Sequence, residues 1–168
     1  MSQVLIYGVP DAGKTTISKA LQYKTGIPLI EGDYIRPYPA TKFVWRKYGS
    51  LTKENTVKGL LYVRDYMRKD VDRVLVEYDK VILEAVFIDP APYRNKAKVF
   101  LLVCLDEDVH KKQFFETRKE TEESKQNFAA VRMIQEYLIE EAQKLDVKVI
   151  RNDAAPQVVL EQMVNELT

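Results

Sequence analysis

Near the start of the chain, two glycines, a lysine and a threonine are spaced as in a phosphate-binding loop. Gly8 and Gly13 enclose four residues, and Lys14 and Thr15 follow directly. Glycines allow a tight turn and a close approach of the backbone to an anion. The loop N–H groups and the dipole of the following helix then favour negative charge. Lys14 can reach the β- and γ-phosphates, and the Thr15 hydroxyl suits Mg²⁺.

We therefore predict that this P-loop binds ATP together with Mg²⁺. A short apolar strand precedes the loop and a helical pattern follows it, which is the context that the loop requires. An ordinary glycine-containing turn is the alternative interpretation. The residues expected to contact the nucleotide are Gly8, Val9, Pro10, Asp11, Ala12, Gly13, Lys14, Thr15 and Thr16.

Two charged residues follow the second predicted strand and could act on an acceptor. Asp33 lies at the edge of the sheet where ligands of open α/β folds bind. Its carboxylate could take the proton of an acceptor hydroxyl during phosphoryl transfer. Glu31 competes for this role, and a turn aspartate bonded to its own backbone is the alternative. Arg36 is suited to bind an anionic group of the acceptor, or else is an exposed surface arginine.

Glu84 is the one charged residue in the apolar segment 81–86. An ionised carboxylate without a partner is costly in such a strand. We expect it to face Mg²⁺-bound water, Lys14 or an arginine, as a Walker B acid does; a structural, ion-paired glutamate is the alternative. His110, beside two lysines on a charged helix, is interpreted as a surface residue.

The elements that would position these side chains alternate between strand and helix. Apolar runs predict strands, and apolar residues at helical spacing predict the helices between them. This order predicts an α/β, three-layer P-loop NTPase fold, with a parallel five-stranded sheet flanked by helices. We expect one domain over 1–168, with an acceptor-side insertion at 34–78 and a lid at 111–127. The predicted strands are 4–7, 27–30, 81–86, 99–105 and 147–150, and the predicted helices are 15–24, 54–77, 106–119, 128–144 and 154–167.

Composition excludes several classes of protein. The chain has 168 residues and a net charge of +1, so no basic field suggests a nucleic-acid partner. Its single cysteine, Cys104, lies in an apolar run and is expected to be buried. Neither a secretory signal nor a membrane-spanning run is recognised, so a cytoplasmic enzyme without membrane contact is expected. The oligomeric state, including a homo-oligomer, is left open.

Among P-loop proteins, the sequence favours kinases of small molecules. GTPases need an Asn-Lys-x-Asp segment after a late strand, whereas the segments here are 106–108 and 151–153 and do not fit. Motor ATPases generally have longer chains. Two alternatives stay open: a nucleotide or RNA-end kinase, and a module whose ATP state switches binding to a partner.

Several segments resemble archaeal 2-phosphoglycerate kinases. The order of motifs matches in the first half of the chain, at the P-loop, 33–36 and 81–84. The match is more specific in the second half, at His110, Phe114, 132–138 and 147–152. The resemblance implies a Mg²⁺-dependent ATP phosphotransferase with a closing lid. It also implies a phosphorylated, anionic hydroxy acid as the small-molecule acceptor. By this likeness Arg118, Lys119 and Arg132 would clasp phosphates on closure, and Asn152 would lie near the adenine.

Two departures from that family concern the acceptor. Phe87 stands where the family has a histidine, and Gln113 stands where it has a basic residue. These changes predict a less polar acceptor, with Phe87 binding the substrate. The other aromatics of the expected apolar wall are Tyr38, Phe43, Trp45 and Tyr93. A mevalonate phosphate is therefore an alternative acceptor to 2-phosphoglycerate.

Overall fold

Five parallel strands form the centre of the protein, as predicted. The structure is a computed structural model that describes residues 3–32 and 41–168. The strands lie in the order β2-β3-β1-β4-β5, and each pairs with its neighbours in parallel. Their bounds are β1 (Gln3–Tyr7), β2 (Leu29–Glu31), β3 (Val81–Ala85), β4 (Lys98–Val103) and β5 (Lys148–Arg151).

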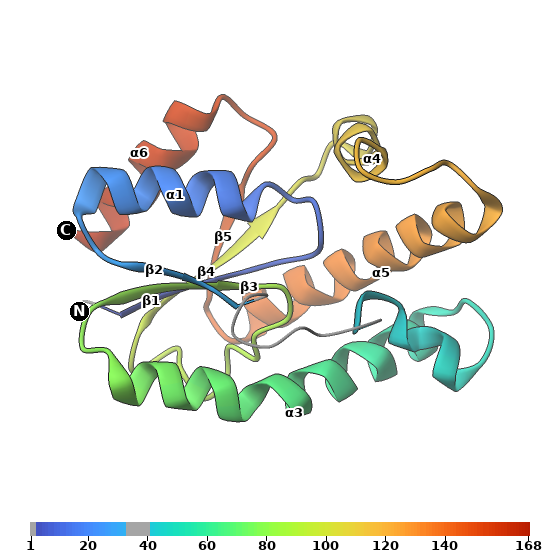
Figure 1. The fold of residues 1–168 in the computed structure, drawn as a ribbon, viewed down its shortest axis with the longest axis horizontal. Helices are drawn as coiled ribbons and strands as arrows, with labels where there is room; N and C mark the ends of the chain where they lie inside the picture. The colour runs from blue at the N-terminus through green and yellow to red at the C-terminus, as the bar shows by residue number, and fades with distance from the viewer. Residues whose placement is uncertain (1–2, 33–40) are drawn as a thin grey trace.

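Helices cover both faces of this sheet (Figure 1). The helices α1 (Lys14–Thr25) and α6 (Pro156–Leu167) lie on one face, and α3 (Lys53–Glu77) and α5 (Glu122–Lys144) lie on the other. This is the predicted three-layer arrangement. Helix α1 ends at Gly26, whose φ of 71° is left-handed and whose N–H donates to the Gln22 carbonyl.

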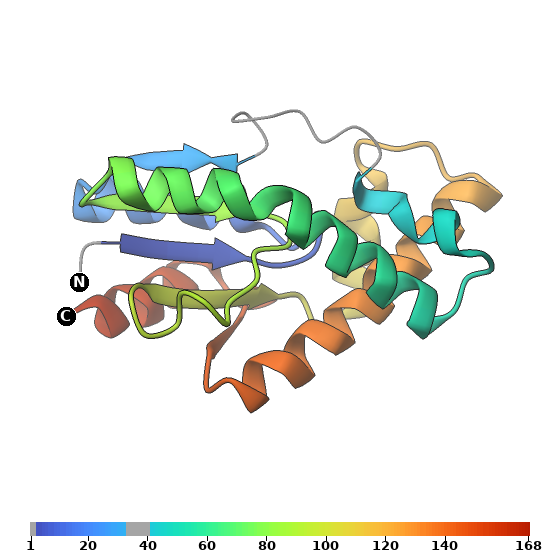
Figure 2. The ribbon, with the colours of Figure 1, turned by 90° about the horizontal axis from the view of Figure 1, so that it is seen from below.

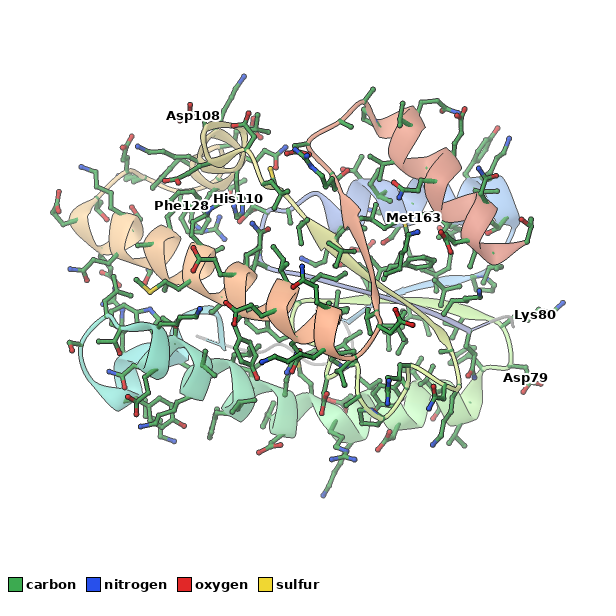
Figure 3. The ribbon with its side chains drawn as sticks, turned by 180° about the vertical axis from the view of Figure 1, so that it is seen from behind. Asp79, Lys80, Asp108, His110, Phe128 and Met163 are labelled. Carbon is green, nitrogen blue, oxygen red and sulfur yellow. The ribbon has the colours of Figure 1, made fainter. Side chains whose placement is uncertain are left out.

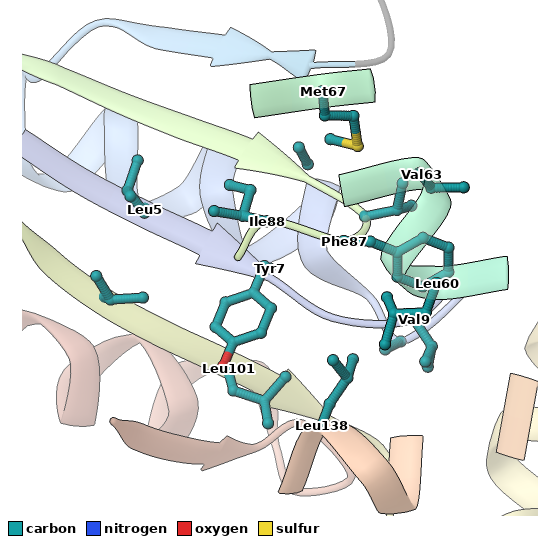
Figure 4. Close-up of a cluster of buried hydrophobic side chains, with 14 of the residues drawn as sticks. Leu5, Tyr7, Val9, Leu60, Val63, Met67, Phe87, Ile88, Leu101 and Leu138 are labelled. Carbon is teal, nitrogen blue, oxygen red and sulfur yellow. The ribbon is translucent and has the colours of Figure 1, made fainter. Parts of the chain in front are cut away.

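Side chains of each strand alternate between two hydrophobic cores, one under each helical layer. In β1, Val4 and Ile6 pack in the core beneath α1 and α6. Leu5 and Tyr7 point the other way, into the core beneath α3 and α5, and Figure 4 shows Tyr7 near Leu101 and Leu138. Because both faces are covered, the strands read as continuous apolar runs.

The carboxyl ends of the strands meet the remaining elements at one end of the sheet. Here lie α4 (Glu107–Phe115), the 3₁₀ helix η1 (Thr41–Tyr48) and the first turns of α3 and α5 (Figures 1 and 2). Helix α5 begins at Glu122, six residues before the predicted start, because Thr121 and Ser124 form a reciprocal capping box. None of the helices in the described ranges is long and apolar enough to cross a bilayer.

Candidate active site

The P-loop connects the end of β1 to the start of α1, and two glycines shape it. Gly8 has a φ of +153°, and a β-carbon there would collide with the Leu102 carbonyl oxygen of β4. Gly13 caps α1 with a left-handed φ of +81°, and a β-carbon there would collide with the Asn152 amide. Neighbouring strands thus require both glycines, independently of any phosphate.

A cavity of about 250 Å³ lies over this loop. Lys14 is 5% exposed, and its ammonium donates to the Val9 carbonyl at 2.8 Å. Arg118 enters the cavity from the loop after α4 and donates to the Asp11 carboxylate at 2.6 Å. Asp11 itself has a left-handed φ of 60°. The residues lining the cavity are Pro10, Asp11, Gly13, Lys14, Thr15, Glu84, Val86 and Arg118.

Thr15 and Glu84 both line this cavity and are in contact there. The Thr15 hydroxyl donates to a Glu84 carboxylate oxygen at 3.3 Å. Glu84 is 6% exposed and lies on β3, level with Ile6 of the adjacent β1. A hydroxyl and a carboxylate are oxygen donors that fit Mg²⁺. Within residues 3–32 and 41–168, no three His, Cys, Asp or Glu side chains form a metal site, so phosphate and water would complete the coordination.

A second cavity, of about 280 Å³, adjoins the P-loop on the side of β5 and shares Gly13 with the first. Asn152 follows β5 and donates from its side-chain amide to the Ala12 carbonyl at 2.7 Å. Asn152 therefore lies next to the P-loop and lines this second cavity. Sequence reasoning missed Val109, Asp153 and Pro156 of its lining, and it related Gln113, which also lines this cavity, to the acceptor.

Arg118 and Arg132, both expected to clasp phosphate, have different surroundings. Arg118 lines the first cavity and packs over the Phe114 ring, 4.1 Å from its centroid. Arg132 instead donates to the carbonyls of Cys104, at 2.7 Å, and Leu105, at 3.1 Å. The Arg132 guanidinium thus binds the carbonyls that follow β4 and is not among the residues that line these two cavities, so its expected contact with phosphate stays a prediction.

His110 is fully buried, so its interpretation as a surface residue was wrong. Its Nε2 lies 3.0 Å from the Pro10 carbonyl oxygen, and its Nδ1 lies 3.2 Å from Arg132 Nη1. Its ring packs edge-on against Phe128, between α4 and α5 (Figure 3). Burial lowers the pKa of the His110 imidazole, and the nearby charges of Arg132 and Lys14 add to this effect.

The acceptor side differs from the sequence prediction. Phe87 is 1% exposed and packs in the core beneath α3, so it presents no surface to a substrate. Trp45 and Tyr93 are also buried, and the Tyr93 hydroxyl donates to Asp72 at 2.6 Å. An apolar acceptor wall made from these three residues is therefore wrong. Asp33, Arg36 and Tyr38 lie outside the described residues, and Glu31 pairs with Lys19 at 3.2 Å.

Comparison with known sequences confirms the resemblance. No family model matches the chain. The 2-phosphoglycerate kinase of Methanocaldococcus jannaschii is 26% identical over 89% of this chain and 58% of its own length. The enzyme of the same name from Methanopyrus kandleri is 26% identical over 93% of this chain and 58% of its own length. The chain thus spans under two thirds of the length of these relatives.

Solved structures confirm the fold. A shikimate kinase from Bacteroides thetaiotaomicron superposes with a TM-score of 0.65 and 18% identity, over 98% of this chain and 97% of that one. A deoxyadenosine kinase from M. mycoides with bound dATP superposes with a TM-score of 0.61 and 14% identity, over 99% of both chains. The chain has the α/β fold of P-loop kinases.

Proposed function

We propose that this protein is an ATP-dependent small-molecule kinase that phosphorylates a hydroxyl group of a phosphorylated hydroxy acid. One observation carries the proposal: Lys14, Thr15, Glu84 and Arg118 converge on a single cavity, which shares Gly13 with a second cavity beside Asn152. The first cavity suits a triphosphate, and the second suits a nucleoside. Together they describe a donor site for ATP.

The residues of the first cavity divide the work of phosphoryl transfer. Lys14 and Arg118 neutralise the charge that develops on the transferring group. Thr15 and Glu84 would hold Mg²⁺, which would supply positive charge beside the phosphates. Residues 111–127 act as the lid, which excludes water so that ATP is not hydrolysed.

The transfer itself needs an acceptor oxygen and a proton acceptor. The acceptor hydroxyl oxygen bonds to the γ-phosphorus while the bond to the β-phosphate oxygen breaks, which releases ADP. We assign the hydroxyl proton to Asp33 and the anionic group of the acceptor to Arg36, following the sequence pattern.

The preferred acceptor in this proposal is 2-phosphoglycerate. Both curated relatives carry that activity in their names. The alternative, a mevalonate phosphate, depended on an apolar wall in the acceptor pocket. Phe87, Trp45 and Tyr93 are buried, so they cannot form that wall.

A screen of acceptors tests the proposal. Purified protein with Mg-ATP is incubated with 2-phosphoglycerate, 3-phosphoglycerate, mevalonate phosphate, shikimate, deoxyadenosine and 5′-hydroxyl RNA, and ADP release is measured for each. We expect release with 2-phosphoglycerate above all others. Preference for deoxyadenosine or RNA would contradict the proposal, and so would nucleotide binding without release for any acceptor.

A further inference from the structure

The buried His110 joins helix α4 to the P-loop, and its neighbours define its protonation state. The Pro10 carbonyl can only accept a hydrogen bond, so the Nε2 atom, 3.0 Å away, must carry the hydrogen. The Arg132 guanidinium can only donate, so Nδ1, 3.2 Å from its Nη1, must accept. Both contacts are satisfied together only by the neutral imidazole with its hydrogen on Nε2.

Arg132 is in turn held by the end of β4. Its two terminal nitrogens donate to the Cys104 and Leu105 carbonyls, at 2.7 and 3.1 Å. Phe128 of α5 packs against the His110 ring with centroids 5.3 Å apart. A continuous set of contacts therefore runs from β4 through Arg132 and His110 to the Pro10 carbonyl.

The contact to Pro10 sets the direction of the next backbone N–H. In a planar trans peptide the carbonyl and the following N–H point in opposite directions, and the chain has no cis peptide bond in its described part. His110 does not line the cavity over the loop, whereas Pro10 and Asp11 do. With the Pro10 carbonyl directed at His110, the Asp11 N–H is directed away from it.

The backbone at Asp11 needs such support. Its φ of 60° is left-handed, a conformation that persists in residues other than glycine when the surroundings enforce it. His110 holds the peptide before Asp11, and Arg118 holds its side chain at 2.6 Å. The loop is therefore fixed on both sides of this residue.

We propose that His110 is a positioning residue of the P-loop, which aims the Asp11 N–H at the β- and γ-phosphates of the nucleotide, with Arg132 selecting the required tautomer. This rests on the proposed function only in that the cavity binds a nucleoside triphosphate. His110 acts through the backbone of the loop and touches no substrate.

Binding measurements on two variants test the assignment. His110→Phe keeps a ring but loses both hydrogen bonds, whereas His110→Gln keeps a donor that can reach the Pro10 carbonyl. By calorimetry we expect His110→Phe to raise the Kd for ATP roughly 3- to 10-fold, as expected for the loss of a buried hydrogen bond. The Kd for AMP, which has no β- or γ-phosphate, should change less than about twofold, and His110→Gln should restore most of the ATP affinity.

Several outcomes would overturn the assignment. Unchanged ATP affinity in His110→Phe would contradict it, and so would equal loss of ATP and AMP affinity, which indicates a merely structural role. If the wild-type protein binds no ATP, the proposed function fails along with it. If the wild-type protein binds ATP and transfers phosphate, and His110→Phe binds ATP equally well, only the inference on His110 is overturned.

A measurement on the wild-type protein keeps the test independent of variant folding. The chain has one histidine, so imidazole ¹⁵N chemical shifts report His110 alone. At pH 7.5 we expect the neutral ring with its hydrogen on Nε2. A hydrogen on Nδ1, or a charged ring, would contradict the inference.

The pH dependence follows from the same contacts. The groups facing the ring are Arg132 and Lys14, which disfavour its protonation, and Asp11 and the Pro10 carbonyl, which favour it. Burial is the largest influence, and the pKa lies below its ordinary value of 6.5. Protonation would place an N–H donor of His110 against the Arg132 guanidinium and break their contact. As the pH is lowered below 6.5, the ATP affinity of the wild-type protein should therefore decrease more steeply than that of His110→Gln. The variant is the control for titration of ATP itself. Parallel profiles would contradict the inference.

Discussion

The guanidinium of Arg118 lies 2.6 Å from the carboxylate of Asp11, inside the cavity over the P-loop. Arg118 is therefore in place to contact phosphate, but its present partner is an acid of the same loop. An arriving triphosphate adds negative charge beside Asp11 and competes with it for the guanidinium. Nucleotide binding should replace this ion pair with a phosphate contact.

Asp11→Asn should tighten ATP binding. The substitution removes the competing charge, and asparagine tolerates the left-handed φ of 60° found here. We expect the Kd for ATP to fall by about 3- to 10-fold at low salt, with a smaller gain at high salt because of screening. Calorimetric titration at two salt concentrations checks this. Weaker binding would indicate that the carboxylate itself supports the nucleotide.

Arg118→Met should act mainly on turnover. The side chain loses the charge that, in the proposed function, stabilises the transferring group, so kcat should fall by about 10²- to 10³-fold. Lys112→Met is the matched control, because it removes an exposed charge on the neighbouring helix α4. Steady-state kinetics with saturating ATP measures both. Equal effects of the two variants would refute a specific role for Arg118.

Gly13→Ala should lose both stability and nucleotide binding. A side chain there is strained at φ +81° and displaces the Asn152 amide. Gly26→Ala is the control, because Gly26 has a similar φ of +71° but nothing within 4 Å of a β-carbon. Each should lose about 1 kcal/mol in urea unfolding. ATP binding should be weakened in Gly13→Ala alone, and retained binding there would contradict the packing described.

The ion pair between Arg64 of α3 and Glu141 of α5 should hold these helices together beside the site. Their nitrogens and oxygens lie 2.5 and 2.7 Å apart, and the Arg64 side chain is 4% exposed. Arg64→Met should reduce the free energy of unfolding by about 3 kcal/mol or more, because it leaves the Glu141 charge with less compensation. The double variant with Glu141→Leu should recover much of this loss. Urea denaturation of all three variants gives the coupling, and additive losses would contradict it.

The P-loop part of the candidate site could be recognised from sequence because its residues are contiguous. The P-loop spacing brings glycine, lysine and threonine together, and Glu84 was identifiable as a charge inside an apolar strand. The sheet and its helical layers followed from the apolar runs. The 3₁₀ helix η1 was not predicted, and the ends of several elements shifted, most clearly the start of α5, where the Thr121–Ser124 capping box was overlooked.

The errors involve side chains whose partners are distant in sequence. His110 contacts Pro10, a hundred positions away, and two neighbouring lysines made its helix look exposed. A signal was present, because His110 and Phe114 are four residues apart and share the buried face of α4. Phe87 follows a strand end, where ligands often bind, but the first half of α3 covers it. Residue propensity and spacing along the sequence do not show which side chains are buried by elements distant in the sequence.

Direct identification of the product tests the central claim. Protein, Mg-ATP and 2-phosphoglycerate are followed by ³¹P NMR, with Lys14→Ala and the exposed-residue control Lys24→Ala alongside. We predict a bisphosphorylated glycerate and ADP in equal amounts, with Lys24→Ala unaffected and Lys14→Ala slower by about three orders of magnitude or more. Release of ADP and inorganic phosphate without a bisphosphorylated glycerate, or transfer that survives Lys14→Ala unchanged, would contradict the account.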